Sequence, residues 1–246
     1  MQSTKYCSTR STTNFARLCR LVTVCADLLR DLLEHFIPKV TLRHEIKVAK
    51  EKIKKALNSS QQHRLFNKEK LFDAWYDDLD IAILYVLLRN LCDENAPKQT
   101  KQQKRMKPPL NGWGKTPTQE DRSLAANIER IRLFRNDTFH RQGDSVADNE
   151  FEKIWDEMKN AVEEIEKELQ NKLNSTKYVD TLEKILVMPM DTVMIQKYIE
   201  EIERMRIHQE SLEEIMHEYS RRYQKSPGIE SRIVVSNHCI LSIMKN

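Results

Sequence analysis

Glycine and proline are scarce in this chain, which contains 4 Gly and 7 Pro among its 246 residues. Charged residues make up 32 % of the sequence, and Glu, Lys and Leu are frequent. This composition is typical of a helical protein, and the length suits one large domain or a medium domain with an appendage. A hydrophobic fraction of 39 % suffices for a core, whereas a mean hydropathy of −0.66 leaves long helix faces in water. We therefore predict an all-α fold, an antiparallel helical bundle followed by a helical C-terminal extension.

Metal and cofactor motifs are missing from the sequence. The five cysteines have no Cys-x-x-Cys spacing; they are Cys7, Cys19, Cys25, Cys92 and Cys239. Three of them lie in apolar runs, which favours buried free thiols over disulfides or metal ligands. A glycine-rich phosphate loop, a His-Glu-x-x-His pair and acidic residues spaced for two metals do not occur either. We expect neither a cofactor nor a metal site.

Long hydrophobic runs are also missing, since none approaches the ~18 apolar residues that a membrane span requires. The apolar stretch over residues 21–33 is interrupted by Asp27, Arg30 and Asp31, unlike the apolar part of a secretory signal. We expect a soluble cytoplasmic protein without a membrane partner.

The net charge of +4 is too small to indicate nucleic-acid binding. One predicted helix, residues 42–57, is nevertheless strongly basic on the face opposite Ile46 and Ile53. That face carries Arg43, Lys47, Lys50, Lys52, Lys54 and Lys55, against Glu45 and Glu51. It is either an ordinary solvated face or a surface that contacts phosphates. Lys47, Lys50 and Lys54 are therefore candidate RNA-binding residues.

Apolar residues at steps of three and four predict further helices on both sides of this basic segment. The predicted ranges are 14–36, 80–92, 118–140 and 147–173. Helix 80–92 is apolar all round and belongs inside the bundle, and the preceding Asp80 suits a helix cap. Residues 58–76 are predicted to be a connection, and residues 1–11 to be disordered. A basic loop with four of the seven prolines, residues 93–118, is predicted to be a flexible tether.

The bundle is thus expected over residues 12–174, with an extension over 177–224 and a tail over 225–246. The extension carries a heptad pattern with one seam at Ile195, Ile202, Gln209 and Met216, and the other at Tyr198, Met205, Leu212 and Tyr219. This spacing supports a coiled coil, although packing of the same helix on the bundle is about as well supported. In the first case residues 195–219 would join two copies or bind a protein partner.

The run Arg135-Asn136-Asp137-Thr138-Phe139-His140 contains the groups that metal-free RNA cleavage needs. Histidine can move a proton near neutral pH, and arginine can hold a phosphate through two hydrogen bonds. On a regular helix Asn136 and His140 lie about 40° apart, whereas Arg135 lies about 140° from His140. Joint action therefore requires Arg135 to reach round the helix or the helix to deform. The alternative is a structural one, because cations near a helix C-terminus also interact well with the helix dipole.

Two further arginines are candidates for the same groove. Arg132 lies one turn before Asn136, and Arg89 lies near the end of the apolar helix 80–92. Both are predicted to contact RNA if the groove binds it.

Several stretches of the chain follow one another in an order that is found in a known family. They are Asn14-Phe-Ala-Arg-Leu-Cys-Arg-Leu-Val22, Asp80-Ile-Ala-Ile-Leu-Tyr-Val-Leu-Leu-Arg-Asn-Leu-Cys92, Gly112-Trp113, Ser123-Leu124, Ile128-Glu-Arg-Ile-Arg-Leu-Phe-Arg-Asn136 and Ser145-Val-Ala-Asp-Asn-Glu-Phe-Glu-Lys-Ile-Trp155. The set, which covers roughly residues 12–170, resembles the HEPN superfamily (higher eukaryotes and prokaryotes nucleotide-binding). Within it, the subgroup named for the DAZ-interacting zinc-finger RING ubiquitin ligase is the most similar.

The resemblance implies an all-α bundle with an Arg-x4-to-6-His motif, which maps onto Arg135 and His140 with Asn136 at the polar position after the arginine. Many members of the superfamily dimerise so that two motifs share one cleft, and catalytic members are metal-independent endoribonucleases. In that scheme His140 assists proton transfer and Arg135 stabilises the phosphate. Related sequences often place glycine before the histidine, where this chain has Phe139.

Two functions are consistent with these patterns. One is an RNA-binding HEPN module, acting as a homodimer, with metal-independent endoribonuclease activity on single-stranded RNA. The other is a non-catalytic interaction or dimerisation adaptor in regulatory or innate-immune signalling. The second is supported by residues 150–168, where eight acidic residues face three lysines, because such a surface repels RNA and suits protein partners.

Overall fold

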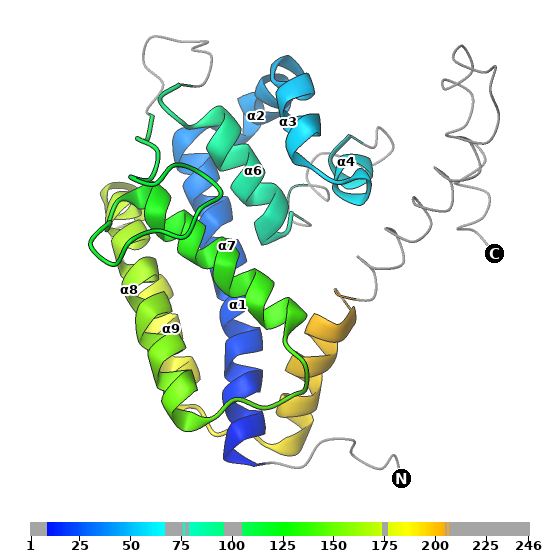
Figure 1. Cartoon of the computed structure of the whole chain (residues 1–246), viewed down its shortest axis with the longest axis vertical. Helices are drawn as coiled ribbons and strands as arrows, with labels where there is room; N and C mark the ends of the chain where they lie inside the picture. The colour runs from blue at the N-terminus through cyan, green and yellow to red at the C-terminus, as the bar shows by residue number, and fades with distance from the viewer. Residues whose placement is uncertain are drawn as a thin grey trace, which may run out of the picture.

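The computed structural model describes residues 9–66, 76, 79–95, 105–173, 177–204 and 206. Within these ranges the regular structure is helical, which confirms the predicted all-α fold (Figure 1). The helices are α1 (Arg10–Phe36), α2 (Lys39–Val48), α3 (Lys50–Ala56), α4 (Ser59–Phe66), α6 (Ile81–Leu91), α7 (Leu124–His140), α8 (Asp148–Leu173) and α9 (Lys177–Val187), followed by a helix over residues 192–204. None of the described helices is long and apolar enough to cross a membrane.

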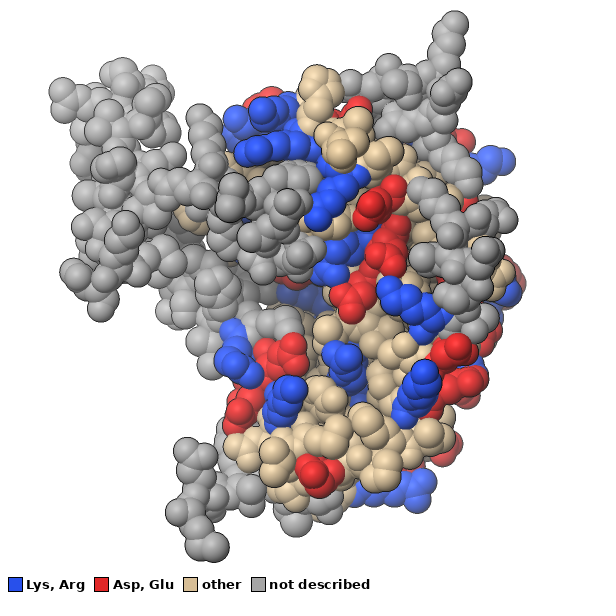
Figure 2. Space-filling view, turned by 180° about the vertical axis from the view of Figure 1, so that it is seen from behind, with Lys and Arg blue, Asp and Glu red and all other residues tan. Residues whose placement is uncertain are grey.

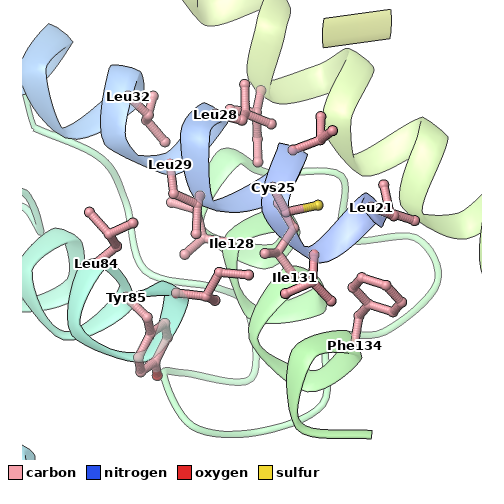
Figure 3. Close-up of a cluster of buried hydrophobic side chains, with 14 of the residues drawn as sticks. Leu21, Cys25, Leu28, Leu29, Leu32, Leu84, Tyr85, Ile128, Ile131 and Phe134 are labelled. Atoms are coloured by element: carbon pink, nitrogen blue, oxygen red, sulfur yellow. The ribbon is translucent and has the colours of Figure 1, made fainter. Parts of the chain in front are cut away.

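Helix α1 lies at the centre of the bundle, and α6, α7, α8 and α9 pack around it (Figures 1 and 3). Its buried side chains point in several directions, so that one helix can serve all four neighbours. Leu21, Cys25 and Leu29 of α1 meet Ile128 and Ile131 of α7 in the interior. The described cysteines Cys19, Cys25 and Cys92 are free and buried, as the apolar runs predicted.

The start of α1 differs from the sequence prediction, which placed disorder up to residue 11 and the start of the helix at Asn14. The helix begins at Arg10 because Thr9 and Thr12 cap it reciprocally, each side chain bonding to the backbone N–H of the other. Asn14 is buried instead, and its amide donates to Val146 O and to Asp148 Oδ1, 3.2 and 2.8 Å away. The first turns of α1 are thereby tied to the start of α8.

The basic segment forms a corner of three short helices, whereas the sequence predicted one helix and a connection. The backbone leaves α geometry at Ala49, which separates α2 from α3. Leu42, Ile46 and Ile53 nevertheless all reach the core. Residues predicted to be a connection form α4, whose start is fixed by mutual bonds between the side chains and N–H groups of Asn58 and Gln61.

The predicted flexible tether is an ordered irregular segment in its described parts, residues 93–95 and 105–118. The backbone of Met106 bonds to Cys92 O and to Glu94 N, and Trp113 Nε1 donates to Asp93 Oδ2 at 2.6 Å. The buried Arg130 guanidinium binds the carbonyl oxygens of Thr118 and Asp121. These contacts hold the segment against α6 and α7. Residues 96–104 lie outside the described residues.

Helix α7 begins at Leu124 and not at Thr118, because the Ser123 hydroxyl accepts a hydrogen bond from Ala126 N and caps the first turn. The neighbouring helix α8 occupies the predicted range almost residue for residue. The prediction for α6 is also confirmed, because Asp80 caps it by accepting from Ile83 N at 3.0 Å and nearly all of its side chains are buried.

The helix over residues 192–204 packs on the bundle. Ile195, Ile199 and Ile202 are buried in the same core as α1 and α8, and Arg20 lies over the ring of Tyr198. For this part of the extension the structure favours packing on the bundle over a coiled coil, and the core therefore continues beyond residue 174. The later seam positions, from Met205 onward, lie outside the described residues.

Candidate functional site

The motif Arg135 to His140 occupies the last turns of α7. The helix stays regular to its end at His140, and Thr138 Oγ1 donates to Phe134 O without interrupting it. The deformation that would bring Arg135 and His140 together therefore does not occur. Within one chain the two side chains remain on different sides of α7.

Arg135 is held against its own helix. Arg135 is only 5 % exposed, and its guanidinium carbon lies 3.9 Å from the centroid of the Phe139 ring. Arg135 Nη1 also donates to Asn136 Oδ1 at 3.2 Å. A guanidinium stacked on an aromatic face is in a favourable position for an arginine, so Phe139 competes with any phosphate for this side chain.

His140 lies in a different environment, because it is exposed at the C-terminal end of α7. Asn136 is half-buried. The structure thus presents the imidazole to solvent and withdraws the guanidinium, so that one copy of the chain does not present the two groups jointly.

Arg132 does not lie free in a groove. Its Nε donates to Glu129 Oε2 at 2.7 Å, and its guanidinium carbon lies 5.2 Å from the centroid of the Tyr85 ring. The Glu129 side chain is fully buried and also accepts from the Tyr85 hydroxyl and from Gly114 N. Burial, and then the hydrogen bond to Glu129, raises the pKa of Tyr85 to about 12. Arg132 therefore neutralises an interior carboxylate.

Arg89 stands beside this buried cluster, which we define as Tyr85, Gly114, Glu129 and Arg132. It is half-buried, and its charge acts on Tyr85. Gly114 has a φ of +83°, a conformation that only glycine adopts readily, and its N–H thereby reaches Glu129. Our sequence prediction missed this cluster because its members come from three separate segments. The only sequence signal was Gly112-Trp113-Gly114, two glycines around a large aromatic residue.

The basic face predicted for residues 42–57 forms a surface on α2 and α3, next to α4. Residues 39–64 contain eight Lys and Arg against two Glu. Most of these cations are exposed, namely Arg43, Lys47, Lys50, Lys52 and Lys55, and Lys54 is half-buried. Figure 2 shows Lys and Arg gathered at the upper end of the molecule, where α2, α3 and α4 lie in Figure 1. We call these six residues the basic surface.

The acidic stretch on α8 divides into two groups. Glu152, Asp156 and Glu157 are exposed. Glu166 is buried and accepts from Tyr178 N and Val179 N, so it caps the start of α9. Glu166 therefore has a structural role, and it is not part of the exposed acidic surface. Among the residues that the structure describes, no group of three or more His, Cys, Asp and Glu is arranged to hold a metal ion.

Comparison with known proteins relates the whole arrangement to one family. Residues 33–198, more than half of the chain, match the family described as DZIP3/hRUL138-like HEPN. The matched region includes the basic surface, the buried cluster and the α7 motif. No curated protein and no solved structure matches the chain.

Proposed function

The chain belongs to the DZIP3/hRUL138-like HEPN family, and we propose that it binds single-stranded RNA through the basic surface of α2 and α3. The observation that carries this proposal is the local excess of eight Lys and Arg over two Glu in residues 39–64, with most of these side chains exposed. Eight Lys and Arg less two Glu leave six positive charges in this segment, more than the net charge of +4 of the whole chain. Such a concentration attracts phosphates and releases the counterions that surround them.

The geometry supports RNA binding better than RNA cleavage. Endoribonuclease activity needs Arg135 and His140 in one cleft, and within one chain they face different environments. A homodimer can bring together groups from two copies, but each Arg135 would first have to leave the ring of Phe139 and Asn136 Oδ1. A stacked and partly desolvated guanidinium is stabilised by about 2 kcal/mol, which opposes this rearrangement.

Charge reversal tests the binding proposal. The variant Lys47→Glu, Lys50→Glu, Lys54→Glu is compared with Lys153→Glu, Lys159→Glu, Lys167→Glu, which changes the net charge equally on α8. Fluorescence anisotropy with labelled oligouridylate should show at least about a tenfold weaker affinity and a shallower salt dependence for the first variant only. Equal losses in both variants, or none in the first, would contradict a specific RNA surface.

The nuclease version is tested separately by incubating the protein with labelled single-stranded RNA in EDTA. We expect the RNA to remain intact. Cleavage that disappears in both Arg135→Ala and His140→Ala would overturn the proposal of binding without cleavage and would establish the endoribonuclease.

A non-catalytic interaction adaptor is a second candidate, favoured by the exposed acidic residues Glu152, Asp156 and Glu157 on α8. In its homodimeric form it predicts twice the chain mass by light scattering. Ile195, Ile199 and Ile202 are already buried in their own bundle, so these three side chains are not available for that contact. A monomer at all concentrations up to the high micromolar range would exclude the homodimer.

A further inference from the structure

The corner between α3 and α4 places an aromatic ring inside the basic surface. Phe66 is the last residue of α4 and is half-buried, whereas the adjacent Leu65 is buried and anchors the helix end. The ammonium groups of Lys50 and Lys54 lie 5.9 and 5.8 Å from the centroid of the Phe66 ring. Two cations and a partly exposed aromatic side chain therefore share one site.

The position of this ring is fixed by the backbone around it. Gln62 Nε2 donates to Lys54 O and Leu57 O, both at 3.0 Å, which locks α4 to the last turn of α3. The mutual bonds between Asn58 and Gln61 fix the first turn of α4. The aromatic ring is thus carried by a braced corner.

We propose that Phe66 is a stacking platform for an unpaired RNA base, and that Lys50 and Lys54 bind the phosphates on either side of that base. This inference rests on the RNA binding proposed above and names the part of the nucleotide that the surface recognises beyond its charge. It adds a binding role to Phe66, a half-buried residue that also packs against the hydrophobic core.

The two lysines can change partners at low cost. A cation about 6 Å from a ring centroid is at the outer limit of the cation–π interaction, and such contacts are weak at exposed sites. An ammonium group binds a phosphate oxygen more strongly through a charge-assisted hydrogen bond. Arrival of the RNA backbone would therefore draw Lys50 and Lys54 aside and uncover the face of the ring.

The platform would select for single strands. In a duplex each base is already stacked and paired, so its face is not available to a protein ring, whereas an unpaired base can stack on any aromatic side chain. Lysines supply point charges without a fixed hydrogen-bonding geometry. The expected ligand is therefore single-stranded RNA with little sequence preference.

The test separates the base from the phosphate. The full chain is titrated with labelled oligouridylate and with an abasic oligomer of the same length and phosphate count. Wild type should prefer oligouridylate by about fivefold or more, the effect of stacking one base on an aromatic ring. Phe66→Leu keeps an apolar side chain and should lose this preference, Phe66→Trp should keep it, and binding of the abasic oligomer should not change.

Each other outcome is decisive. Equal affinity of wild type for the two oligomers overturns the proposal that Phe66 is a stacking platform. This result comes from the wild-type protein alone, so it does not depend on whether a variant folds. If Phe66→Leu lowers the affinity for both oligomers equally, the proposal is also overturned, because the substitution then acts by disturbing the structure. If the platform fails while the reversal of Lys47, Lys50 and Lys54 still abolishes binding, RNA binding stands. If wild type binds neither oligomer, the proposed function itself fails.

Discussion

At the scale of single residues, Arg135 and Phe139 explain why the α7 motif does not converge. Residues four apart on a helix are neighbours, so the long side chain of Arg135 falls onto the ring of Phe139. His140, one residue further, points elsewhere and remains exposed. A glycine at position 139 would offer no ring and would remove this contact. The identity of residue 139 thus contributes to the structural role of Arg135.

This role predicts a contrast in stability. Arg135→Ala should lower the free energy of unfolding by about 1–3 kcal/mol, because a buried, stacked side chain is removed. His140→Ala should change it by no more than about 0.5 kcal/mol, as usual for an exposed position. Urea denaturation followed by circular dichroism measures both. Small and equal effects would show that Arg135 is not held as the structure indicates.

The buried cluster around Glu129 predicts a loss of stability in alkali. The pKa of Tyr85 is raised from 10.0 to about 12, and the protonated phenol donates to Glu129. Its contribution is present in full below pH 10.0 and is lost as the pH rises through about 12. Burial likewise raises the pKa of the Cys25 thiol from 9.0 to about 12, which adds to the same loss.

The variant Tyr85→Phe isolates the contribution of the Tyr85 hydroxyl to the free energy of unfolding. Near neutral pH it should cost about 1 kcal/mol, the usual value of a hydrogen bond whose donor is removed. Above pH 10.0 its stability should fall less steeply than that of wild type, since the phenol no longer titrates. Urea midpoints across the alkaline range measure this difference. Parallel curves for the two proteins would contradict the assignment.

At the scale of elements, caps and anchors determine where helices begin and which surfaces they bury. Thr9 and Ser123 set the starts of α1 and α7 several residues away from the positions predicted by apolar periodicity. In helix 192–204, packing likewise decides which of its surfaces is buried. Its apolar residues satisfy both a coiled-coil seam and a bundle face, and burial of Ile199, which lies off the heptad seam, favours the bundle.

Ile199 therefore provides the element-scale prediction. Ile199→Ala should destabilise the chain by about 2–4 kcal/mol, because it opens a cavity in the core where Ile199 is 1 % exposed. The control Val193→Ala lies on the same helix at a residue that is 70 % exposed and should have an effect within about 0.5 kcal/mol. Similar small effects at both positions would mean that this helix does not pack on the bundle.

At the scale of the whole molecule, one continuous core runs from α1 to Ile202. Tyr178, Leu182 and Ile185 of α9 join it, and the buried Glu166 of α8 caps α9. The boundary predicted near residue 174 therefore falls inside one continuous core, and we expect the two sides of it to unfold together. The family match, which extends to residue 198, also crosses it.

Two fragments test this unity. A fragment of residues 1–174 exposes the apolar surface that α9 and helix 192–204 cover, so it should bind the dye ANS and lose a cooperative thermal transition. A fragment of residues 1–206 retains both helices and should melt like the full chain. Cooperative unfolding of the shorter fragment at the temperature of the longer one would show that the extension is a separate unit.

Much of the fold could be predicted from local sequence patterns. Side-chain periodicity, which depends on residues close together in the chain, predicted the all-α fold, the burial of α6, the apolar stripes of α7 and α8, and the basic surface with Lys47 and Lys50. Contacts between distant segments settled the rest. Arg132 pairs with Glu129 because Tyr85 and Gly114 come from distant segments to complete the cluster. The isoleucines of helix 192–204 are covered because this helix packs against α1. A periodic pattern shows which face of a helix is apolar, but the partner that buries this face is determined by packing in three dimensions.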